Sequence, residues 1–179
     1  MDIKIVRLSP RNWLKYCDQI DRIEEASYEA ARKDSISYLH SILLKPGSRC
    51  FVAVCQGKAV GFCFGASLEA FPDVDGTRTD PEWNKGTTFY SANLAVDSKY
   101  RRRGIASALK QRQIQETRSQ GYSFLAGRNR VGLAEGMIEL NASLGAYEVQ
   151  RIANYYQDDL DPKDLTYYHI DLDRLSSTV

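Results

Sequence analysis

Three arginines and a glycine, Arg101–Gly104, separate a strand-like apolar run from a helix-like stretch, and this junction constrains the fold most. The run is Asn93–Val96, and the helical pattern begins at Ile105 and extends to about residue 120. Cations at a helix N-terminus are unfavourable, because that end already carries partial positive charge. An anion bound there reverses the balance, since backbone N–H groups and guanidinium groups both suit phosphate. The junction therefore predicts either a phosphate-bearing ligand or a solvated charged loop.

Size and charge narrow the function classes. A chain of 179 residues is long enough to bury one core, so we expect a single domain over residues 1–179. With 24 basic and 23 acidic residues the formal net charge is +1. Binding nucleic acid over a whole surface needs a dominant basic field, so we expect no nucleic-acid partner.

The cysteines and the termini bear on location. Cys17, Cys50, Cys55 and Cys63 show no C-x-x-C spacing, and the chain has two histidines, so we expect no metal site. Three of these cysteines lie in apolar strand-like runs and are expected to be reduced core residues, which predicts a cytoplasmic protein. The charged N-terminus does not resemble a signal peptide, and the longest apolar run is too short to span a membrane.

The hydrophobic pattern predicts the order of the elements. Strand-like patterns occupy about residues 3–8, 50–55, 59–68, 87–96, 122–126, 147–156 and 165–172. Helix-like patterns occupy about residues 10–26, 34–44, 105–120 and 137–144. We expect Ser9 and Pro10 to start the first helix, Gly145 to end the last, and Gln56-Gly57 to form a tight hairpin turn. This order predicts a mixed α/β sheet with helices on both faces.

A long loop over residues 69–86 interrupts this order. It contains five acidic residues, Glu69, Asp73, Asp75, Asp80 and Glu82. Long loops inside a domain are often functional, and this one could attract a cationic amine. The alternative is a solubilising surface loop.

The order of elements, together with two motifs, resembles the GNAT superfamily of acyl-CoA-dependent N-acyltransferases over essentially the whole chain. Arg101, Gly104 and Ala106 match the superfamily's pyrophosphate motif, Gln/Arg-x-x-Gly-x-Gly/Ala, at the start of its third helix. The segment 137–146, which contains Leu144-Gly145-Ala146, is similar to its later helix ending in Leu-Gly-Phe. The resemblance implies an α/β (α+β) fold with a single mixed, mostly antiparallel sheet of about seven strands and about four flanking helices.

The resemblance also implies a binding site for acetyl-CoA as co-substrate. The residues implied to bind it are Leu94, Ala95, Val96, Arg101, Arg102, Arg103, Gly104, Ile105, Ala106, Ser107, Asn141 and Leu144. The backbone of Leu94–Val96 would hold the pantetheine arm and stabilise the oxyanion, while the arginine loop would hold the diphosphate. Superfamily members often form dimers, so a homodimer is a further expectation.

The catalytic residues are less well specified. Many superfamily members carry a tyrosine as general acid at the position of Asn141, and an asparagine cannot supply a proton near neutral pH. Another group, such as one of the nearby tyrosines, or solvent must then protonate the sulfur. Glu69 is the first candidate for general base and Tyr90 the second, with a solvated loop carboxylate as the alternative for Glu69 and a water relay as the alternative mechanism. His169 is interpreted as structural.

These observations favour an N-acetyltransferase that moves an acetyl group from acetyl-CoA to a primary amine, on a small molecule or a protein, by direct attack in a ternary complex. The first alternative is a non-catalytic acyl-CoA-binding sensor or a degenerate family member. A second, RNA binding, rests on a weak echo of an RNA-recognition motif at Arg103–Ala106. Helix-like sequence follows that segment, where the motif requires a strand.

Overall fold

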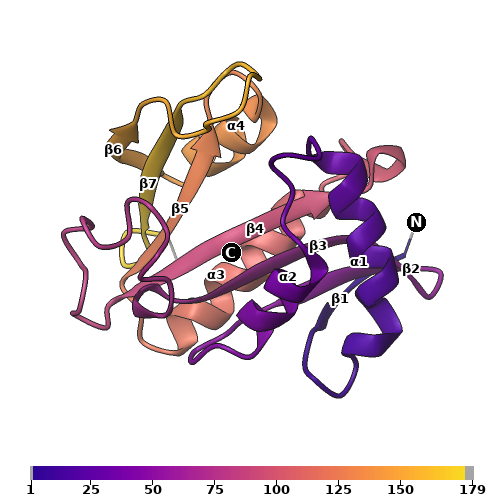
Figure 1. Cartoon of the computed structure of the whole chain (residues 1–179). Coiled ribbons are helices and arrows are strands. Elements are labelled where there is room, and N and C mark those ends of the chain that lie inside the picture. The colour runs from indigo at the N-terminus through magenta and orange to yellow at the C-terminus, as the bar shows by residue number, and fades with distance from the viewer. Residues whose placement is uncertain (1, 176–179) are drawn as a thin grey trace. The chain divides into compact units, whose positions relative to one another are not determined.

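The computed structural model describes residues 2–175 and contains, over that range, the predicted order of helices and strands (Figure 1). Its strands are β1 (Ile3–Arg7), β2 (Phe51–Cys55), β3 (Lys58–Ser67), β4 (Thr88–Val96), β5 (Phe124–Arg130), β6 (Tyr147–Ile152) and β7 (Leu165–Asp171). Its helices are α1 (Trp13–Ser27), α2 (Ile36–Leu43), α3 (Ile105–Ser119) and α4 (Glu135–Ser143), with 3-10 turns η1 (Leu68–Ala70) and η2 (Ser98–Tyr100).

The strands form one seven-stranded sheet in the order β1-β2-β3-β4-β5-β7-β6. The pairs β1–β2, β2–β3, β5–β7 and β6–β7 are antiparallel, and the pair β4–β5 is parallel. The expected mixed, mostly antiparallel sheet with four flanking helices is therefore confirmed. Residues 2–175 divide into two compact units, which are described separately below; the expectation of a single domain stays a prediction.

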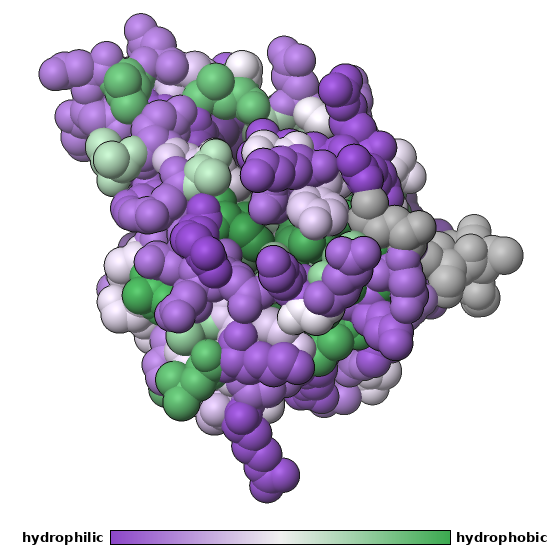
Figure 2. Space-filling view, turned by 90° about the vertical axis from the view of Figure 1, so that its right-hand side faces the viewer, coloured by the Kyte–Doolittle hydropathy of each residue, from purple (hydrophilic) through white to green (hydrophobic). Residues whose placement is uncertain are grey.

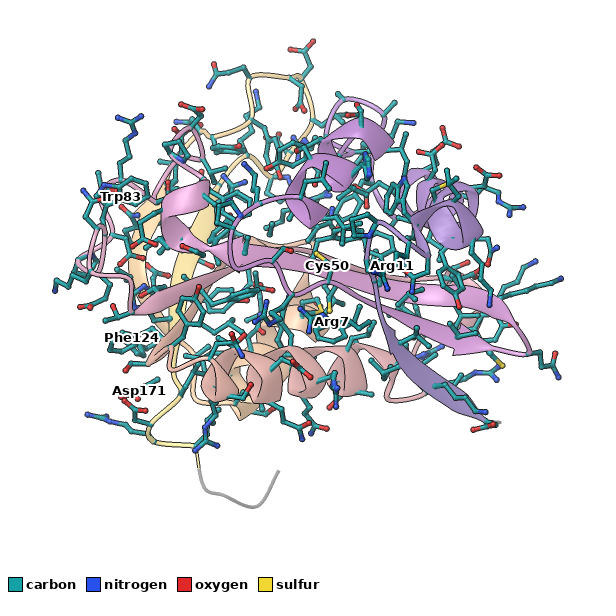
Figure 3. All side chains as sticks on the ribbon, turned by 90° about the horizontal axis from the view of Figure 1, so that it is seen from below. Arg7, Arg11, Cys50, Trp83, Phe124 and Asp171 are labelled. Carbon is teal, nitrogen blue, oxygen red and sulfur yellow. The ribbon has the colours of Figure 1, made fainter. Side chains whose placement is uncertain are left out.

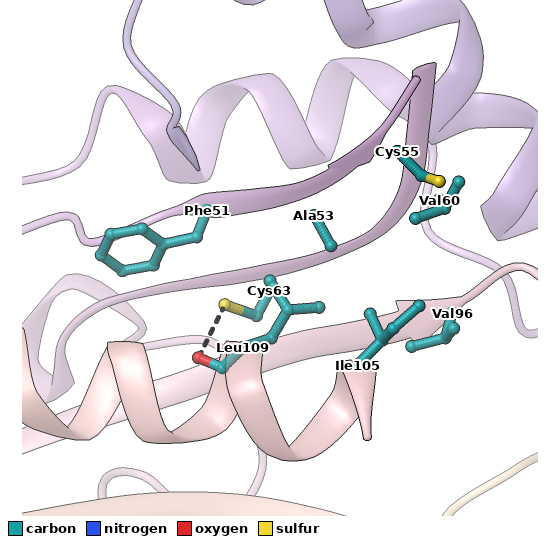
Figure 4. Packing of buried hydrophobic residues seen from close by; sticks show 8 residues of the cluster. All are labelled: Phe51, Ala53, Cys55, Val60, Cys63, Val96, Ile105 and Leu109. Atoms are coloured by element: carbon teal, nitrogen blue, oxygen red, sulfur yellow. Dashed lines mark hydrogen bonds between the residues drawn. The ribbon is translucent and has the colours of Figure 1, made fainter. Parts of the chain in front are cut away.

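The first unit comprises Met1–Ala66 and Ala92–Glu116. Helices α1 and α2 cover one face of its strands, and α3 covers the other (Figures 1 and 4). The face toward α3 carries a buried cluster of Phe51, Ala53, Cys55, Val60, Cys63, Val96, Ile105 and Leu109 (Figure 4). On β2 these residues alternate along the strand, as expected for side chains that point to one face. The three cysteines predicted in the core, Cys50, Cys55 and Cys63, are buried, and all four cysteines are free thiols.

Gly61 allows the close packing of this unit. A Cβ atom at this position would lie 3.1 Å from the carbonyl oxygen of Ala95, 3.2 Å from Val96 Cγ2 and 3.3 Å from Ile105 Cγ2. Two of these atoms belong to β4 and the third to the first residue of α3. Glycine therefore lets β3 approach the strand–helix junction where the ligand site is predicted.

The second unit comprises Ser67–Ser91 and Thr117–Val179. Strand β5 pairs with β7 from Phe124↔Asp171 to Arg130↔Leu165; both residues of the first pair are labelled in Figure 3. The parallel register of β4 with β5 covers four pairs and ends at Ser91↔Gly127, while both strands continue beyond it.

Several predicted boundaries were wrong. Helix α1 starts at Trp13 rather than at Ser9-Pro10, because Asn12 Oδ1 accepts hydrogen bonds from the backbone N–H of Ser9 (2.8 Å) and its hydroxyl (3.3 Å) and holds a turn there. Strand β5 runs to Arg130 rather than to Ala126, because its pairing with β7 continues that far. Strand β6 ends at Ile152 and not at Tyr156. The hairpin turn is confirmed: Gln56 and Gly57 have φ angles of 48° and 78°, as a type I′ turn requires.

Candidate active site

The predicted phosphate loop lies between β4 and α3 in the first unit. Turn η2 follows β4, and the Asp97 carboxylate accepts a 2.9 Å hydrogen bond from the N–H of Lys99. Arg101, Arg102, Arg103 and Gly104 are exposed, and Ile105 is buried. Arg102 and Gly104 have left-handed φ angles of 57° and 77°. The strand–loop–helix junction predicted from the sequence is therefore present.

The three arginines have different surroundings. Arg101 Nε donates to the carbonyl of Val96 (3.1 Å), and its Nη2 lies 3.4 Å from Ser27 Oγ. Arg101 thereby ties the loop to the end of β4. The Arg103 guanidinium lies 5.8 Å from the centroid of the Tyr100 ring, a cation–π arrangement that positions it beside the loop.

The start of α3 offers backbone donors. The Ala108 N–H donates to the carbonyl of Gly104 (2.9 Å), which is the first helical hydrogen bond of α3. The four N–H groups before it, those of Gly104, Ile105, Ala106 and Ser107, have no acceptor within the helix. No atom lies within 4 Å of a Cβ built on Gly104, so the backbone is open to close approach. Helix α3 begins with Ile105, Ala106 and Ser107 and extends for 15 residues. The N-terminus of such a helix can bind an anion.

The side chains at the end of β4 and at the start of α3 contribute to the packing of the first unit. Leu94, Ala95, Val96, Ile105 and Ala106 belong to or pack against the buried cluster beneath α3, or are themselves buried. The side chains of Ala95, Val96 and Ile105 are buried, whereas those of Leu94 and Ala106 are partly exposed. The role that the resemblance gives to the backbone of Leu94–Val96 stays a prediction.

A polar network that the sequence did not predict lies on the other side of β4. Asn93 is buried, and its Nδ2 lies 3.2 Å from both carboxylate oxygens of Glu24 and 2.8 Å from Asp34 Oδ2. The Asp34 N–H donates to Glu24 Oε1 (2.9 Å). The Tyr28 hydroxyl lies 3.3 Å from the Leu94 carbonyl and 3.4 Å from Asn93 Oδ1. The network thus holds β4 at Asn93 and Leu94.

Glu24 is the buried acid of this network, with 1% of its surface exposed. Burial raises its pKa from 4.5 to about 7; repulsion from Asp34 adds to the rise, and the hydrogen bonds from Asp34 and Asn93 oppose it. Glu24 lies four residues after Ile20, and residues four apart share a helix face, so this spacing indicates that Glu24 is on the apolar face of α1. An acid on the buried face of α1 could therefore have been identified.

Replacing Glu24 by glutamine is expected to change the pH dependence of stability. An acid whose pKa is raised by folding stabilises the folded state below its unfolded pKa, and this contribution is lost as the pH rises through about 7. The Glu24→Gln variant should therefore equal the wild type near pH 5 and exceed it by about 1–2 kcal/mol near pH 8, as measured by urea unfolding. The Glu25→Gln variant provides the control, because Glu25 is exposed and its carboxylate lies 2.7 Å from Lys33 Nζ. If the free energy of unfolding depended on pH equally in the wild type and in Glu24→Gln, the raised pKa assigned to Glu24 would be contradicted.

The three predicted catalytic residues lie in the second unit, each with separate partners. Glu69 Oε2 accepts from Ser67 Oγ (2.7 Å) and Oε1 from the Gly86 N–H (3.1 Å), so Glu69 joins the two ends of the loop. Tyr90 is buried, with its ring 4.9 Å from that of Phe71 and 6.3 Å from that of Tyr167.

Asn141 lies on α4 and is 1% exposed. Its Nδ2 donates to Asn129 Oδ1 on β5 (3.0 Å), and its buried Oδ1 has no hydrogen-bond partner among the described residues. Its carbonyl accepts from Leu144 (3.1 Å) and Ala146 (3.0 Å), and Gly145 (φ 77°) closes the helix as predicted. Leu144 is half-buried at this helix end.

A second buried network fixes the acidic loop. Asp80 Oδ2 accepts from the Tyr167 hydroxyl (2.5 Å) and lies 2.7 Å from His169 Nε2, while Oδ1 accepts from the Glu82 N–H (2.7 Å). Burial would raise the pKa of Asp80, but the hydrogen bonds from His169, Tyr167 and Glu82 outweigh it and lower the pKa. His169 is 1% exposed, which fits its structural interpretation.

Other loop carboxylates also have internal partners. Glu82 lies 3.1 Å from Lys85 Nζ and accepts from Thr87 Oγ1 (3.0 Å), and Asp73 is 4.0 Å from Arg78 Nη2. Two of the five loop carboxylates, Asp73 and Glu82, therefore have a cation beside them, and attraction of a cationic amine stays a prediction. Trp83, on the same loop, is labelled in Figure 3.

Residues 2–175 contain neither a metal-binding cluster nor a membrane-spanning helix. No group of three or more His, Cys, Asp or Glu side chains is arranged to hold a metal ion. No helix in this range combines the length and the apolar character needed to cross a bilayer. The surface seen in Figure 2 is mostly hydrophilic, with small separated apolar groups, as is ordinary for a globular protein.

Comparison with solved structures identifies the fold. The ribosomal-protein-S18-alanine N-acetyltransferase of Escherichia coli has a TM-score of 0.73 at 21% identity, with 99% of each chain covered. The putative acetyltransferase yncA of Salmonella typhimurium, solved with acetyl-CoA, has a TM-score of 0.71 at 18% identity, covering 98% of this chain and 96% of that chain. Arabidopsis thaliana Naa50, in complex with a bisubstrate analogue, has a TM-score of 0.70 at 15% identity, covering 94% and 98%.

Sequence comparison identifies the family. No match was found among curated protein sequences. The model of the acetyltransferase (GNAT) family matches residues 13–133, more than half of the 179-residue chain. The match includes β4, the arginine loop and α3, the elements that carry the predicted ligand site. The chain therefore belongs to the acetyltransferase (GNAT) family.

Proposed function

We propose that this acetyltransferase moves the acetyl group of acetyl-CoA directly to a primary amine in a ternary complex. The observation that carries the proposal is the open backbone at Gly104, at the start of α3, with three arginines beside it. The diphosphate of coenzyme A would accept hydrogen bonds from the N–H groups of residues 103–106, with guanidinium charge alongside. The Ser107 hydroxyl would supply a further donor.

The backbone of β4 would align the thioester. Leu94–Val96 lie beyond Ser91, the last β4 residue paired with β5, and their side chains face the protein core. Arg101 donates a hydrogen bond to the Val96 carbonyl, and the Tyr28 hydroxyl donates one to the Leu94 carbonyl. Fixed backbone donors at these positions would stabilise the oxyanion without reorganisation.

The chemical step makes one bond and breaks one. The neutral amine nitrogen attacks the thioester carbonyl carbon, the C–S bond breaks, and one proton moves from nitrogen to a base while the thiolate gains a proton. The products are an N-acetyl amide and free coenzyme A. Glu69 is the proposed base and Tyr90 the second candidate; the Asn141 amide can hydrogen-bond the substrate through its unpartnered Oδ1 but cannot supply the proton.

The acceptor would be an amine on a small molecule or a protein. The structures similar to this chain include an enzyme named for acting on a ribosomal protein and one solved with a bisubstrate analogue carrying a peptide. Peptide N-termini therefore belong in a substrate panel beside amino acids and polyamines. We further propose a cytoplasmic location, a homodimeric assembly, and no metal or nucleic-acid partner, as the sequence predicts.

A non-catalytic acyl-CoA sensor is the alternative, and Asn141 is the observation that favours it. Incubation with acetyl-CoA and the amine panel, followed by mass spectrometry and thiol detection, separates the two. Equal amounts of acetylated amine and released thiol support the transferase. Saturable acetyl-CoA binding with no acetylated amine supports the sensor.

Replacing Gly104 by valine is expected to weaken acetyl-CoA binding about tenfold, because a β-branched residue disfavours φ 77° and the loop must shift. Gly57→Val provides a matched control. Gly57 has φ 78°, also has no atom within 4 Å of a built Cβ, and lies in the same unit. Calorimetry should show unchanged acetyl-CoA affinity for Gly57→Val, with a similar loss of stability in both variants. Equal affinities in the two variants would remove the Gly104 loop from the binding site.

A further inference from the structure

Arg128 on β5 is a cation with an unusual environment in the second unit. Residues two apart on a strand share a face, so Arg128 and Arg130 lie on one face of β5 and Asn129 on the other. Asn129 bonds to Asn141, so its face is the one toward α4. The arginine face instead meets the segment between β6 and β7, where the Arg128 guanidinium lies 4.8 Å from the centroid of the Tyr155 ring.

The Arg128 guanidinium lacks an anionic partner. Its Nη1 is buried and has no hydrogen-bond partner. Its electrostatic neighbours are the tyrosines Tyr90, Tyr155 and Tyr156, and Tyr155 also forms a side-chain hydrogen bond with it. No carboxylate within residues 2–175 forms an ion pair with it. Proteins ordinarily pair buried cations with anions, because a buried charge without a counter-charge is costly.

The stacking of Arg128 on Tyr155 leaves the edge of the guanidinium suited to a carboxylate. The Tyr155 ring covers the face of the guanidinium, which recovers part of the desolvation cost. The N–H groups lie in the plane of the guanidinium and point outward from its edge, so stacking on the ring does not satisfy those of Nη1. Two parallel N–H groups match the two oxygens of a carboxylate. Arg130, 5.9 Å from the Tyr156 ring centroid, adds positive charge on the same face.

The position of Arg128 in the register connects it with the proposed reaction. It directly follows Gly127, whose pairing with Ser91 ends the β4–β5 register. Tyr90, a neighbour of Arg128, directly precedes Ser91 and is a candidate base. Arg128 thus belongs to the end of β5 where the strand leaves its pairing with β4.

We propose that Arg128 binds a carboxylate of the acetyl acceptor, so that the acceptor carries a carboxylate as well as the amine. The inference rests on the proposed acetyl transfer to an amine and narrows its substrate class. Free amino acids and peptides with an acidic residue near the N-terminus satisfy it, whereas polyamines do not. The shared chemistry is an amine and a carboxylate on one molecule.

The test compares acceptors that differ only in this group. One arm uses glycine and alanine against their α-carboxamides. The other uses the amidated dipeptides Ala-Asp and Ala-Glu against Ala-Asn and Ala-Gln. Wild-type protein should favour the carboxylate member of one arm about tenfold or more in kcat/KM, and the arm that shows the preference identifies the source of the carboxylate. Arg128→Met should bring that ratio close to one, and Arg128→Lys should restore part of it, since lysine keeps the charge without the planar pair of donors.

Arg151→Met is the control, because Arg151 is an exposed arginine of the same unit that already pairs with Asp164 (3.2 Å). It should keep the wild-type ratio. The melting temperature of Arg128→Met should equal or exceed that of the wild type, because the variant removes a buried charge without a counter-charge. A lower melting temperature with both acceptor types slowed equally would assign Arg128 a structural role instead.

Two further outcomes would overturn the proposal: no carboxylate preference in the wild type, or a preference that survives Arg128→Met. If Arg128→Met bound acetyl-CoA more weakly than the wild type, the anionic group that Arg128 binds would belong to acetyl-CoA and not to the acceptor. Calorimetry with coenzyme A-loaded protein and the same acceptor pairs separates this inference from the proposed transfer. Arg128-dependent binding of the carboxylate member to coenzyme A-loaded protein, with no acetylated product in the parallel assay with acetyl-CoA, supports the inference and contradicts the transfer. Binding of neither member contradicts the inference.

Discussion

The Asp80→Ala variant is expected to lose about 3–5 kcal/mol of folding free energy, which for a domain of this size threatens folding at 37 °C. The substitution leaves the Tyr167 hydroxyl, His169 Nε2 and the Glu82 N–H without the acceptor that they share in the buried interior. A buried donor that has lost its acceptor costs its full desolvation free energy, because no water molecule replaces the lost hydrogen bond. Urea unfolding at neutral pH measures the loss.

Asp73→Ala is the matched control for this variant. Asp73 lies on the same loop, but its side chain is 95% exposed and 4.0 Å from Arg78. An exposed pair of this kind contributes less than about 1 kcal/mol, so the control should unfold close to the wild type. Because folding lowers the pKa of Asp80, its contribution is present above the ordinary aspartate pKa and is lost as the pH falls below it. Equal stability of the two variants would contradict the anchoring role of Asp80.

Replacing Glu69 by glutamine is expected to lower kcat about 10²-fold while leaving acetyl-CoA affinity unchanged, if Glu69 is the base of the proposed reaction. Glutamine keeps the shape of the side chain and an oxygen that can accept from Ser67 or Gly86, but it cannot take a proton from the amine. Steady-state kinetics and calorimetry with acetyl-CoA provide the two measurements.

Glu82→Gln separates catalysis from loop structure. Glu82 lies on the same loop and also accepts internal hydrogen bonds, from Lys85 and Thr87. Its variant should turn over at close to the wild-type rate. Unchanged turnover in Glu69→Gln would leave Glu69 as the residue that closes the loop, and Tyr90 or a water relay as the base. Equal losses in the two variants would indicate that loop order, and not proton transfer, limits the rate.

The order of elements was predictable because each strand and helix has its own periodicity and local stop signals. Gly145 and the Gln56-Gly57 turn were found because left-handed backbone favours glycine and small polar residues. Boundaries failed where a longer-range contact decides them. Pairing with β7 extends β5, and the Asn12 side chain delays the start of α1.

The ligand loop was predictable because its residues are contiguous, so the motif and the structural junction coincide. The two buried acids were not found. Asn93 reaches Glu24 across 69 positions of the sequence, and His169 reaches Asp80 across 89. Local patterns do not contain such pairings, and an acid in a polar loop does not differ in sequence from a solvated one. The environment of Arg128 was hidden for the same reason, since the partners that surround it come from β4 and from the segment after β6.

Calorimetric titration of the purified protein with acetyl-CoA tests most directly whether the arginine loop at the start of α3 binds the cofactor. We expect saturable uptake by the wild type and by Gly57→Val, with affinity weakened about tenfold in Gly104→Val. The absence of any binding heat at millimolar acetyl-CoA, in protein that is shown to be folded, would contradict the proposed function.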